Sequence, residues 1–231
     1  AGLLGPRLSL AHGVWLDERE IAALADAGVS VVLNPISNLK NKNGVAPIRR
    51  LAAAGVNLAL GCDNCSCTDA QNIFQAMKMF TLLAAVSDPE IGPPDALDAI
   101  RAATFGGART AGLEREIGGI RAGMKADLAV LDLDDPAFVP LNSLARQLVY
   151  SECGRGVDSV IVDGRFVMEN RKIETIDDAA LRDEAEAIMR RFRPEAEAVF
   201  ARNRRLSQYL LEADARVWST DIGMNRYVGD R

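Results

Sequence analysis

The sequence has no excess of basic residues, no long apolar run and no secretion pattern at its start. Its net charge of −5 over 231 residues argues against a general nucleic-acid-binding surface, because such a surface needs a basic stripe. No apolar run approaches the roughly 20 residues that a membrane-spanning helix needs. The opening residues AGLLGPRLSLAHG carry a single arginine and no cleavage-site pattern. We therefore predict no nucleic-acid partner, no membrane span and no signal peptide.

Cysteine and histidine are scarce as well. Three of the four cysteines lie within six positions, which is not the spacing of a secreted disulfide framework. A reducing cytoplasm is therefore the predicted compartment. His12 is the single histidine, and a lone histidine is more often structural than a metal ligand. The remaining composition, 48% hydrophobic and 26% charged, is ordinary for a globular protein.

The first part of the chain alternates short apolar runs with helical patterns. A polar stretch at residues 37–44 is expected to be a loop, and residues 46–55 are expected to form a short helix. The alternation is typical of βα units around a parallel sheet. Apolar runs predict its strands at residues 8–12, 29–35 and 56–61, and the second of these runs is rich in β-branched residues.

Two spacings in the same region predict where helices begin. Asp17 and Glu20 have the D-x-x-E spacing of a capping box. Thr68 and Gln71 are expected to cap a long helix over residues 69–86. Each of these helices would follow a strand, as a βα arrangement requires.

Helical patterns also frame the second part of the chain. Residues 94–112 are expected to be helical with a break at Gly106–Gly107. Residues 177–214 are charged and rich in alanine and leucine, which predicts a helix interrupted at Pro194. We find no internal repeat of solenoid length.

Between these helices the period changes to that of strands. Residues 126–133 and 147–151 predict strands. Residues 157–173 predict a hairpin that turns at Asp163–Gly164, because both residues tolerate positive φ. The chain therefore divides into an α/β part, a β part and a helical part.

The cysteine-rich stretch LGCDNCSCTD raises the alternative of a thiol metal site. Cys62, Cys65 and Cys67 have a C-x₂-C-x-C spacing, and thiolates at such spacing bind zinc or iron–sulfur clusters. Such sites want four ligands, and the remaining cysteine, Cys153, is far away in sequence. Alternatively, the three residues are small side chains that fill a turn.

Asp63, within the same stretch, and His12 are the other candidates. His12 is the last residue of one predicted strand, and Asp63 lies just past the end of another, where α/β folds place their ligands and catalytic groups. A single aspartate is often a cap and a single histidine often structural, but two on equivalent strand ends favour a site. A carboxylate and an imidazole at one edge suit metal-assisted hydrolysis.

Several spaced motifs resemble the amidohydrolase superfamily. Ala11–Gly13 matches its "AHG" strand end, Asn34–Asn38 its "NP-x-SN" loop, and Leu60–Asp63 its "LGxD" strand. The resemblance continues through residues 119–134 and the hairpin at 157–173. The branch that it resembles holds guanine, cytosine and methylthioadenosine/S-adenosylhomocysteine deaminases and the triazine hydrolases.

The resemblance implies an α/β fold: the C-terminal part of a (β/α)₈ barrel, with about three βα units, followed by a β-sandwich portion and a C-terminal helix. A full barrel needs roughly 250 residues. The family's His-x-His pair and its fifth-strand histidine have no counterpart, because His12 is the single histidine. We therefore expect a portion of a larger enzyme, inactive alone. The implied parts are residues 1–118 (barrel), 119–176 (sandwich) and 177–231 (helical extension and tail).

The resemblance also implies residue roles. Asp63 matches the eighth-strand aspartate that ligates the metal and takes a proton from its water, and His12 matches the sixth-strand histidine that contacts the hydroxide or the substrate. Trp15 either stacks on a planar substrate ring or anchors strand to helix. The implied cofactor is one divalent metal ion, zinc or iron, in the intact parent, absent or weakly held in this chain. The cysteines match no family ligand.

Two functions follow as expectations. The first is hydrolysis of a C–N bond, a deamination of a small nitrogen heterocycle, by the parent enzyme. The second is a non-catalytic half-domain. In either case an unpaired sheet edge favours a homo-oligomer or pairing with the missing N-terminal half.

Overall fold

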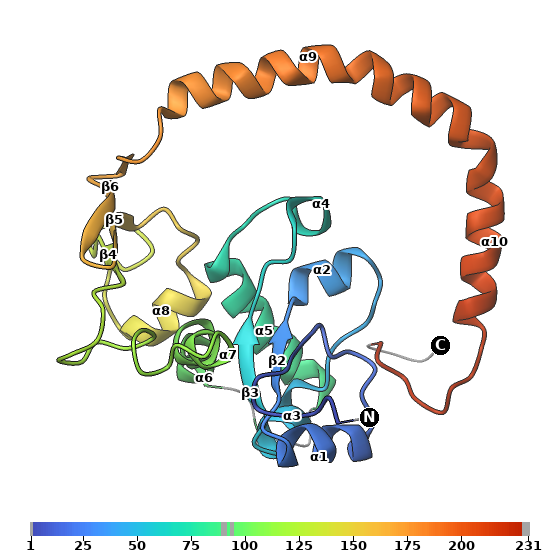
Figure 1. Ribbon diagram of the computed structural model, residues 1–231, viewed down its shortest axis with the longest axis horizontal. Helices are drawn as coiled ribbons and strands as arrows, with labels where there is room; N and C mark the ends of the chain where they lie inside the picture. Colours follow the sequence, from blue (N-terminus) through green and yellow to red (C-terminus); the bar gives the residue numbers. More distant parts are fainter. Residues whose placement is uncertain (1, 89–91, 93–94, 228–231) are drawn as a thin grey trace.

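The computed structural model describes residues 2–88, 92 and 95–227, and its first sheet has three strands. They pair in the order β1-β2-β3, and both pairings are parallel (Figure 1). The strands that the sequence predicts in this region, and their common direction, are confirmed. They are β1 (Ser9–Ala11), β2 (Ser30–Leu33) and β3 (Asn57–Leu60).

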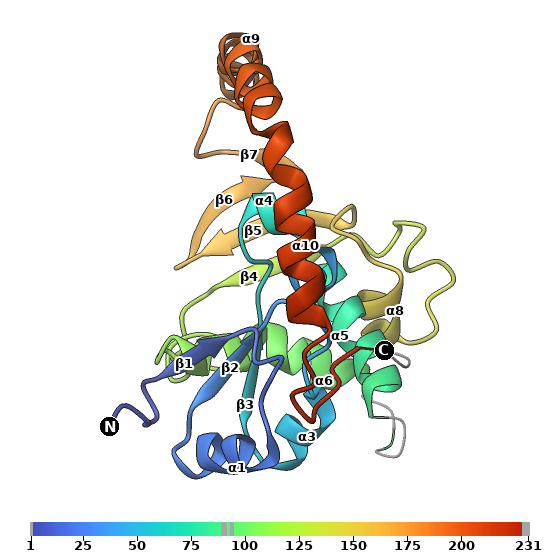
Figure 2. The same cartoon turned by 90° about the vertical axis from the view of Figure 1, so that its right-hand side faces the viewer.

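One face of this sheet carries the main core of the molecule. Val31 lies in register between Leu10 and Leu58, so these three side chains point to the same face. Val31 is completely buried, and burial of such a side chain contributes roughly 1.5–3 kcal/mol. Most of the helical side chains in this buried cluster come from three helices, which are labelled in Figure 2. They are α1 (Glu18–Asp26), α3 (Ile48–Ala53) and α5 (Ile73–Ser87).

The connections between these elements depend on local polar contacts. The capping box at the start of α1 is confirmed, since the side chains of Asp17 and Glu20 each accept a backbone N–H bond from the other. The loop predicted at residues 37–44 is wrong in its first half. Those residues continue α2 (Pro35–Lys40), because proline at the first helical turn is already in helical conformation.

The predicted start of the long helix is wrong. A short helix, α4 (Cys65–Thr68), intervenes and ends at Asp69, whose φ of 63° is left-handed. This turn breaks the helical path before α5, so Thr68 and Gln71 do not cap α5. The Asn72 side chain caps it by accepting a bond from the backbone N–H three residues later.

The Gly106–Gly107 pair does not break its helix. Within the described residues, three helical segments follow one another without a gap, and the middle one is π-helical. The π-helical turn places Gly106 directly against the backbone carbonyl of Leu58 in β3. The segments are α6 (Ala96–Arg101), η1 (Ala102–Gly106) and α7 (Gly107–Thr110).

We expect Gly106→Ala to destabilise the protein by about 1–3 kcal/mol, because overpacking costs of this order are typical. An added Cβ would lie 2.0 Å from the Leu58 carbonyl oxygen, a backbone atom that cannot swing away. Gly107→Ala is the matched control, since nothing lies within 4 Å of its Cβ position. It should be neutral or stabilise by about 0.4–1 kcal/mol. Urea unfolding compares the two, and equal stability would contradict the contact.

The second sheet has four antiparallel strands in the order β4-β5-β6-β7. The predicted hairpin is confirmed: β5 and β6 are joined by Asp163 and Gly164, with φ of 49° and 78°. These positive values are those of the two-residue turn that matches strand twist. The strands are β4 (Leu128–Leu131), β5 (Val157–Val162), β6 (Arg165–Glu169) and β7 (Lys172–Ile173).

The strand predicted at residues 147–151 is wrong, because these residues belong to α8 (Leu144–Tyr150) and its C-cap. The Gln147 side chain donates to the carbonyls of Ala137 and Pro140, and Val149 is completely buried. Tertiary contacts therefore select the helix. A short apolar run has no period that separates helix from strand.

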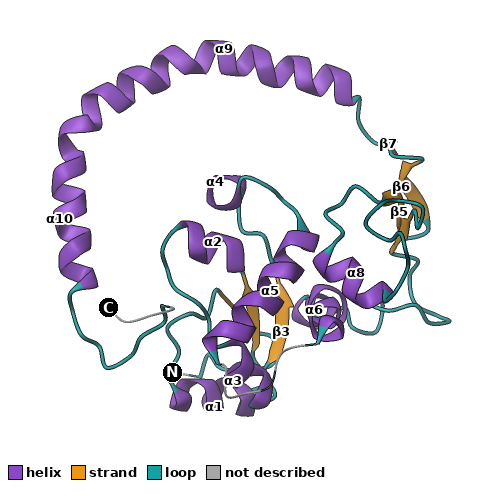
Figure 3. Cartoon of the chain, turned by 180° about the vertical axis from the view of Figure 1, so that it is seen from behind, coloured by secondary structure: helices purple, strands orange, loops and turns teal. Residues whose placement is uncertain are grey.

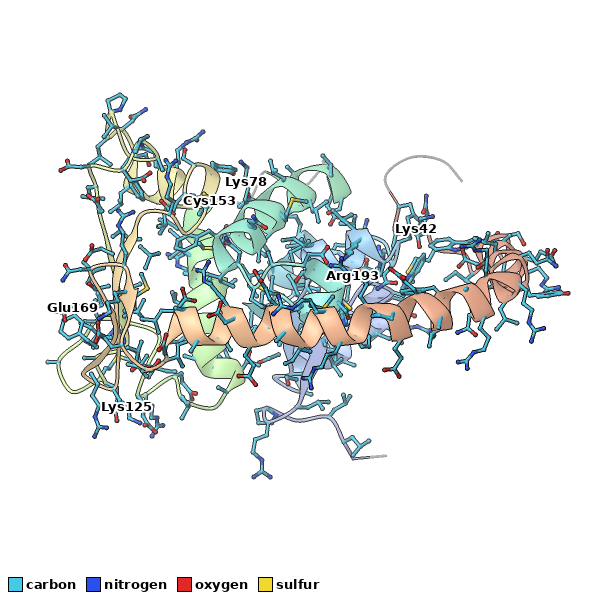
Figure 4. All side chains as sticks on the ribbon, turned by 90° about the horizontal axis from the view of Figure 1, so that it is seen from above. Lys42, Lys78, Lys125, Cys153, Glu169 and Arg193 are labelled. Atoms are coloured by element: carbon cyan, nitrogen blue, oxygen red, sulfur yellow. The ribbon has the colours of Figure 1, made fainter. Side chains whose placement is uncertain are left out.

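The last helices form an arch that stands away from both sheets (Figures 1 and 3). It consists of α9 (Asp178–Asn203), the 3₁₀ turn η2 (Arg204–Leu206) and α10 (Ser207–Trp218). The interruption predicted at Pro194 is wrong, because an exposed helix can curve and leave the freed carbonyl to water. Seen from above, α9 crosses over the rest of the chain (Figure 4). Neither α9 nor another helix of the described residues is long and apolar enough to cross a membrane.

The segment after α10 returns to the first sheet. Arg226 donates from Nε to the carbonyl of Val14 at 3.0 Å, and its own carbonyl accepts from the N–H of Val45 at 2.7 Å. The ring of Tyr227 lies 5.7 Å from that of Trp15. The arch is therefore attached to the body beyond both of its ends.

Candidate functional site

His12 and Asp63 meet at the carboxyl edge of the parallel sheet. His12 directly follows β1, and Asp63 lies three residues after β3. The Nε2 atom of His12 is 3.7 Å from Oδ2 of Asp63. The prediction that both side chains lie at one edge is confirmed.

Both residues have a left-handed backbone. Their φ values are 70° for His12 and 60° for Asp63, a region that few residues other than glycine adopt. The sheet holds His12 there, since its N–H donates to the Val32 carbonyl at 2.8 Å. Gly13 follows with φ of 58°, and a Cβ at that position would lie 2.7 Å from Val31. Such conformations cluster at functional sites, where they direct side chains.

Two side chains of α2 hold this pair from between β1 and β3. Ser37 donates from Oγ to Asp63 Oδ2 at 2.6 Å. Asn38 Oδ1 lies 2.8 Å from His12 Nδ1. Ser37 and Asn38 are 0% and 2% exposed, so the α2 end of each bond is buried. Sequence reasoning identified their motif but assigned no role to either residue; the signal was their place directly after the middle strand.

The surroundings of Asp63 favour its charged form. The pKa of this carboxyl is lowered, first by the Ser37 hydroxyl and then by the backbone N–H of Asn64, which donates to Oδ1 at 2.8 Å. His12 lowers it further by charge, and the Cys67 thiol by a hydrogen bond. Asp63 is therefore a carboxylate at neutral pH, with both oxygens held by donors.

Trp15 is oriented by other contacts. Its indole Nε1 donates to the Asn43 carbonyl at 2.9 Å, and its ring packs at a tilt against Tyr227. These contacts favour the anchoring role that the sequence left open for Trp15 over stacking on a substrate.

The three clustered cysteines surround the start of α4. They are free thiols, and burial raises the pKa of Cys62. The Asn64 side chain caps α4 by accepting N–H bonds from Ser66 and Cys67. Among the described residues, no group of three His, Cys, Asp or Glu side chains could hold a metal ion.

The same finding bears on a metal at Asp63 and His12. A carboxylate oxygen and an imidazole nitrogen are both zinc ligands by chemistry. Catalytic zinc sites nevertheless use three protein ligands and structural ones four, and the described residues supply no such set here. The pair does not fit a complete metal site without further ligands.

Comparison with known proteins gives one family and consistent relatives. The model of the amidohydrolase family matches residues 1–167. A 5-methylthioadenosine/S-adenosylhomocysteine deaminase from Thermococcus onnurineus is 41% identical over 172 residues, covering 74% of this chain and 40% of the relative. A 5′-deoxyadenosine deaminase from Methanosarcina mazei is 35% identical over 185 residues, covering 80% and 42%.

Solved structures agree. An adenosine deaminase from Xanthomonas campestris with bound zinc superposes with a TM-score of 0.81 at 36% identity, covering 84% of this chain and 44% of that one. An atrazine chlorohydrolase from Arthrobacter aurescens, complexed with zinc, gives 0.75 at 27% identity, covering 81% and 42%. The chain spans less than half the length of these relatives.

Proposed function

The chain belongs to the amidohydrolase family, and on this premise we propose that Asp63 and His12 are its share of an active site that hydrolyses a carbon–nitrogen bond. The observation that carries the proposal is the approach of His12 Nε2 to Asp63 Oδ2 at the carboxyl edge of the sheet, with both backbones left-handed. The names of the relatives favour deamination of a small nitrogen heterocycle over other hydrolyses.

The proposed chemistry uses the two side chains in different roles. The oxygen of a water bonds to the ring carbon that bears the amino group, the C–N bond breaks and ammonia leaves. Asp63 takes a proton from that water and delivers one to the departing nitrogen. His12 Nε2 accepts a hydrogen bond from the attacking oxygen or from the substrate. We also propose Asp63 as this chain's ligand to a divalent metal, zinc or iron, whose other ligands lie outside the described residues.

For the fold we propose three of the eight βα units of a (β/α)₈ barrel, since β1, β2 and β3 are parallel and in sequential order. The antiparallel second sheet is proposed as part of a β-sandwich. A cytoplasmic location is supported by the four cysteines, which are all free. The proposed parts are residues 1–118, 119–176 and 177–231.

We propose that the chain works paired with the N-terminal half that its relatives have, or with a second copy of itself. No described strand pairs with the outer edge of β1, where Ser9 and Ala11 are exposed, and open edges invite pairing. The arch provides a second exposed surface, because α9 contains no buried residue. Apolar side chains recur on α9 at helical spacing and are exposed: Leu181, Ile188, Met189, Phe192, Val199 and Phe200.

The proposed function depends on what the chain associates with, and two cases are possible. In the first, the partner supplies the remaining βα units and ligands, and the assembly is a hydrolase. In the second, the chain is a non-catalytic half-domain that associates with a copy of itself or with a partner. The exposed edge and arch favour association in both cases; the left-handed backbones of His12 and Asp63 favour the first.

A complementation experiment tests the hydrolase. The chain is combined with the segment of the Thermococcus onnurineus relative that it does not match, and this assembly is called the completed enzyme below. We expect it to release ammonia from methylthioadenosine, S-adenosylhomocysteine or 5′-deoxyadenosine, and less from an aminotriazine. A complex seen by size-exclusion chromatography that deaminates none of them contradicts the function. A homodimer without complementation supports the half-domain.

A further inference from the structure

Ser37 and Asn38 are adjacent on α2, yet Ser37 contacts Asp63 and Asn38 contacts His12. Neighbouring residues of a helix point in different directions, so one helix after the middle strand reaches the ends of both outer strands. We propose that Asn38 and Ser37 are positioning residues: Asn38 fixes the tautomer of His12, and Ser37 fixes the orientation of Asp63. The catalytic value of this arrangement rests on the proposed function, but the arrangement itself does not.

The bond to Asn38 determines which nitrogen of His12 carries the proton. The amide oxygen Oδ1 is an acceptor only, so Nδ1 at 2.8 Å must be the donor. A neutral imidazole has one N–H, and Nε2 therefore keeps its lone pair. Nε2 faces Asp63 Oδ2 at 3.7 Å, too long for a direct hydrogen bond. A water between the two acceptors can donate one proton to each of them.

The opposite tautomer is disfavoured by burial. With the proton on Nε2, Nδ1 and Asn38 Oδ1 would be two acceptors facing each other. Asn38 is 2% exposed, so water cannot easily replace the lost donor. A buried polar group left without its partner is destabilising. The buried contact with Asn38 therefore favours the Nδ1–H form.

The bond to Ser37 directs Asp63 in a similar way. Asn41 donates from Nδ2 to Ser37 Oγ at 3.2 Å, which leaves the Ser37 hydroxyl proton for Asp63 Oδ2 at 2.6 Å. The backbone N–H of Asn64 holds the other carboxylate oxygen. The carboxylate is therefore fixed at both oxygens, with Oδ2 turned toward His12.

The single histidine makes the tautomer directly measurable. Growth on ¹⁵N-histidine labels His12 alone, and two-bond ¹H–¹⁵N spectra identify the protonated nitrogen. At about pH 9, where histidine is ordinarily neutral, we expect the Nδ1–H form in the chain as it stands. Asn38→Ala should shift His12 toward the Nε2–H form. Asn43→Ala, an exposed asparagine of the neighbouring loop, is the matched control and should change nothing.

Two further variants keep the inference testable if the Asn38→Ala variant does not fold. Asn38→Asp keeps an acceptor of nearly the same shape and should keep the Nδ1–H form. Ser37→Ala acts on Asp63 and should leave the tautomer of His12 unchanged. An Nε2–H imidazole in the unsubstituted chain or in the Asn38→Asp variant overturns the inference. An unchanged Nδ1–H form in a folded Asn38→Ala variant overturns it as well.

A kinetic arm connects the tautomer to the reaction. In the completed enzyme, Asn38→Ala should lower kcat by about 10- to 100-fold, as for partners that orient a ligand histidine, with a smaller change in KM. Asn38→Asp should restore part of the loss. An unchanged kcat with a shifted tautomer contradicts the positioning role. A completed enzyme with no activity contradicts the proposed function. The tautomer spectra still test whether Asn38 fixes the tautomer of His12.

Discussion

Asp63→Asn is expected to reduce kcat of the completed enzyme by about 10³-fold or more, since general acid–base groups contribute about 10²–10⁴-fold. The amide has nearly the same shape and can still accept a bond from Ser37. It cannot take and return a proton, and it has no charge to offer a metal. Turnover is measured as ammonia release, and the zinc content of the same samples should fall as well.

Asp69→Asn is the matched control for this substitution. Asp69 lies six residues further along and is exposed, and it pairs with Lys40 rather than with His12. Exposed ion pairs contribute about 0–1 kcal/mol, so its loss should leave turnover nearly unchanged. An Asp63→Asn enzyme that keeps more than about a tenth of the activity would remove Asp63 from the proposed mechanism.

The second prediction with a large expected effect concerns the isolated chain. Without the complementing segment, the chain should release no ammonia from any of the adenosine-type substrates and should not retain stoichiometric zinc through purification. Asp63 and His12 offer at most two protein ligands, and the described residues contain no larger group. Tightly held zinc needs three or four, because each ligand lost leaves the ion bound more weakly. Addition of the complementing segment should restore both properties.

The parallel sheet and the site pair are predictable from sequence for a simple reason. Short apolar runs mark the strands, and right-handed βα connections carry all strands in one direction. Residues that follow two such strands therefore share an edge, which is where His12 and Asp63 lie. Their roles in catalysis and metal binding remain predictions.

The contacts of Ser37 and Asn38 with the site could not be predicted from the local sequence pattern. The stretch containing Ser37 and Asn38 is polar, and polarity there predicts a loop exposed to water. Pro35 instead begins α2, and this helix buries both side chains against the ends of β1 and β3. Long-range contacts of this kind, 26 residues apart in sequence, have no local signature.

The wrong helix boundaries have a similar cause. Residues 147–151 are a short apolar run whose state is decided by the Gln147 side chain and by burial of Val149. The start of α5 depends on the left-handed Asp69, which the capping pattern at Thr68 and Gln71 does not reveal. Competing caps can be listed from sequence, but only the packed chain selects between them.

The zinc content and turnover of the chain, measured before and after complementation, test the central claim most directly. Metal analysis by mass spectrometry and ammonia release are recorded on the same samples. The account predicts neither property in the isolated chain, and one zinc or iron ion per completed site together with deamination after complementation. Stoichiometric zinc in the isolated chain would contradict it. If that zinc survived Asp63→Asn but not Cys65→Ser, the thiols of the cysteine-rich stretch would be the metal site instead.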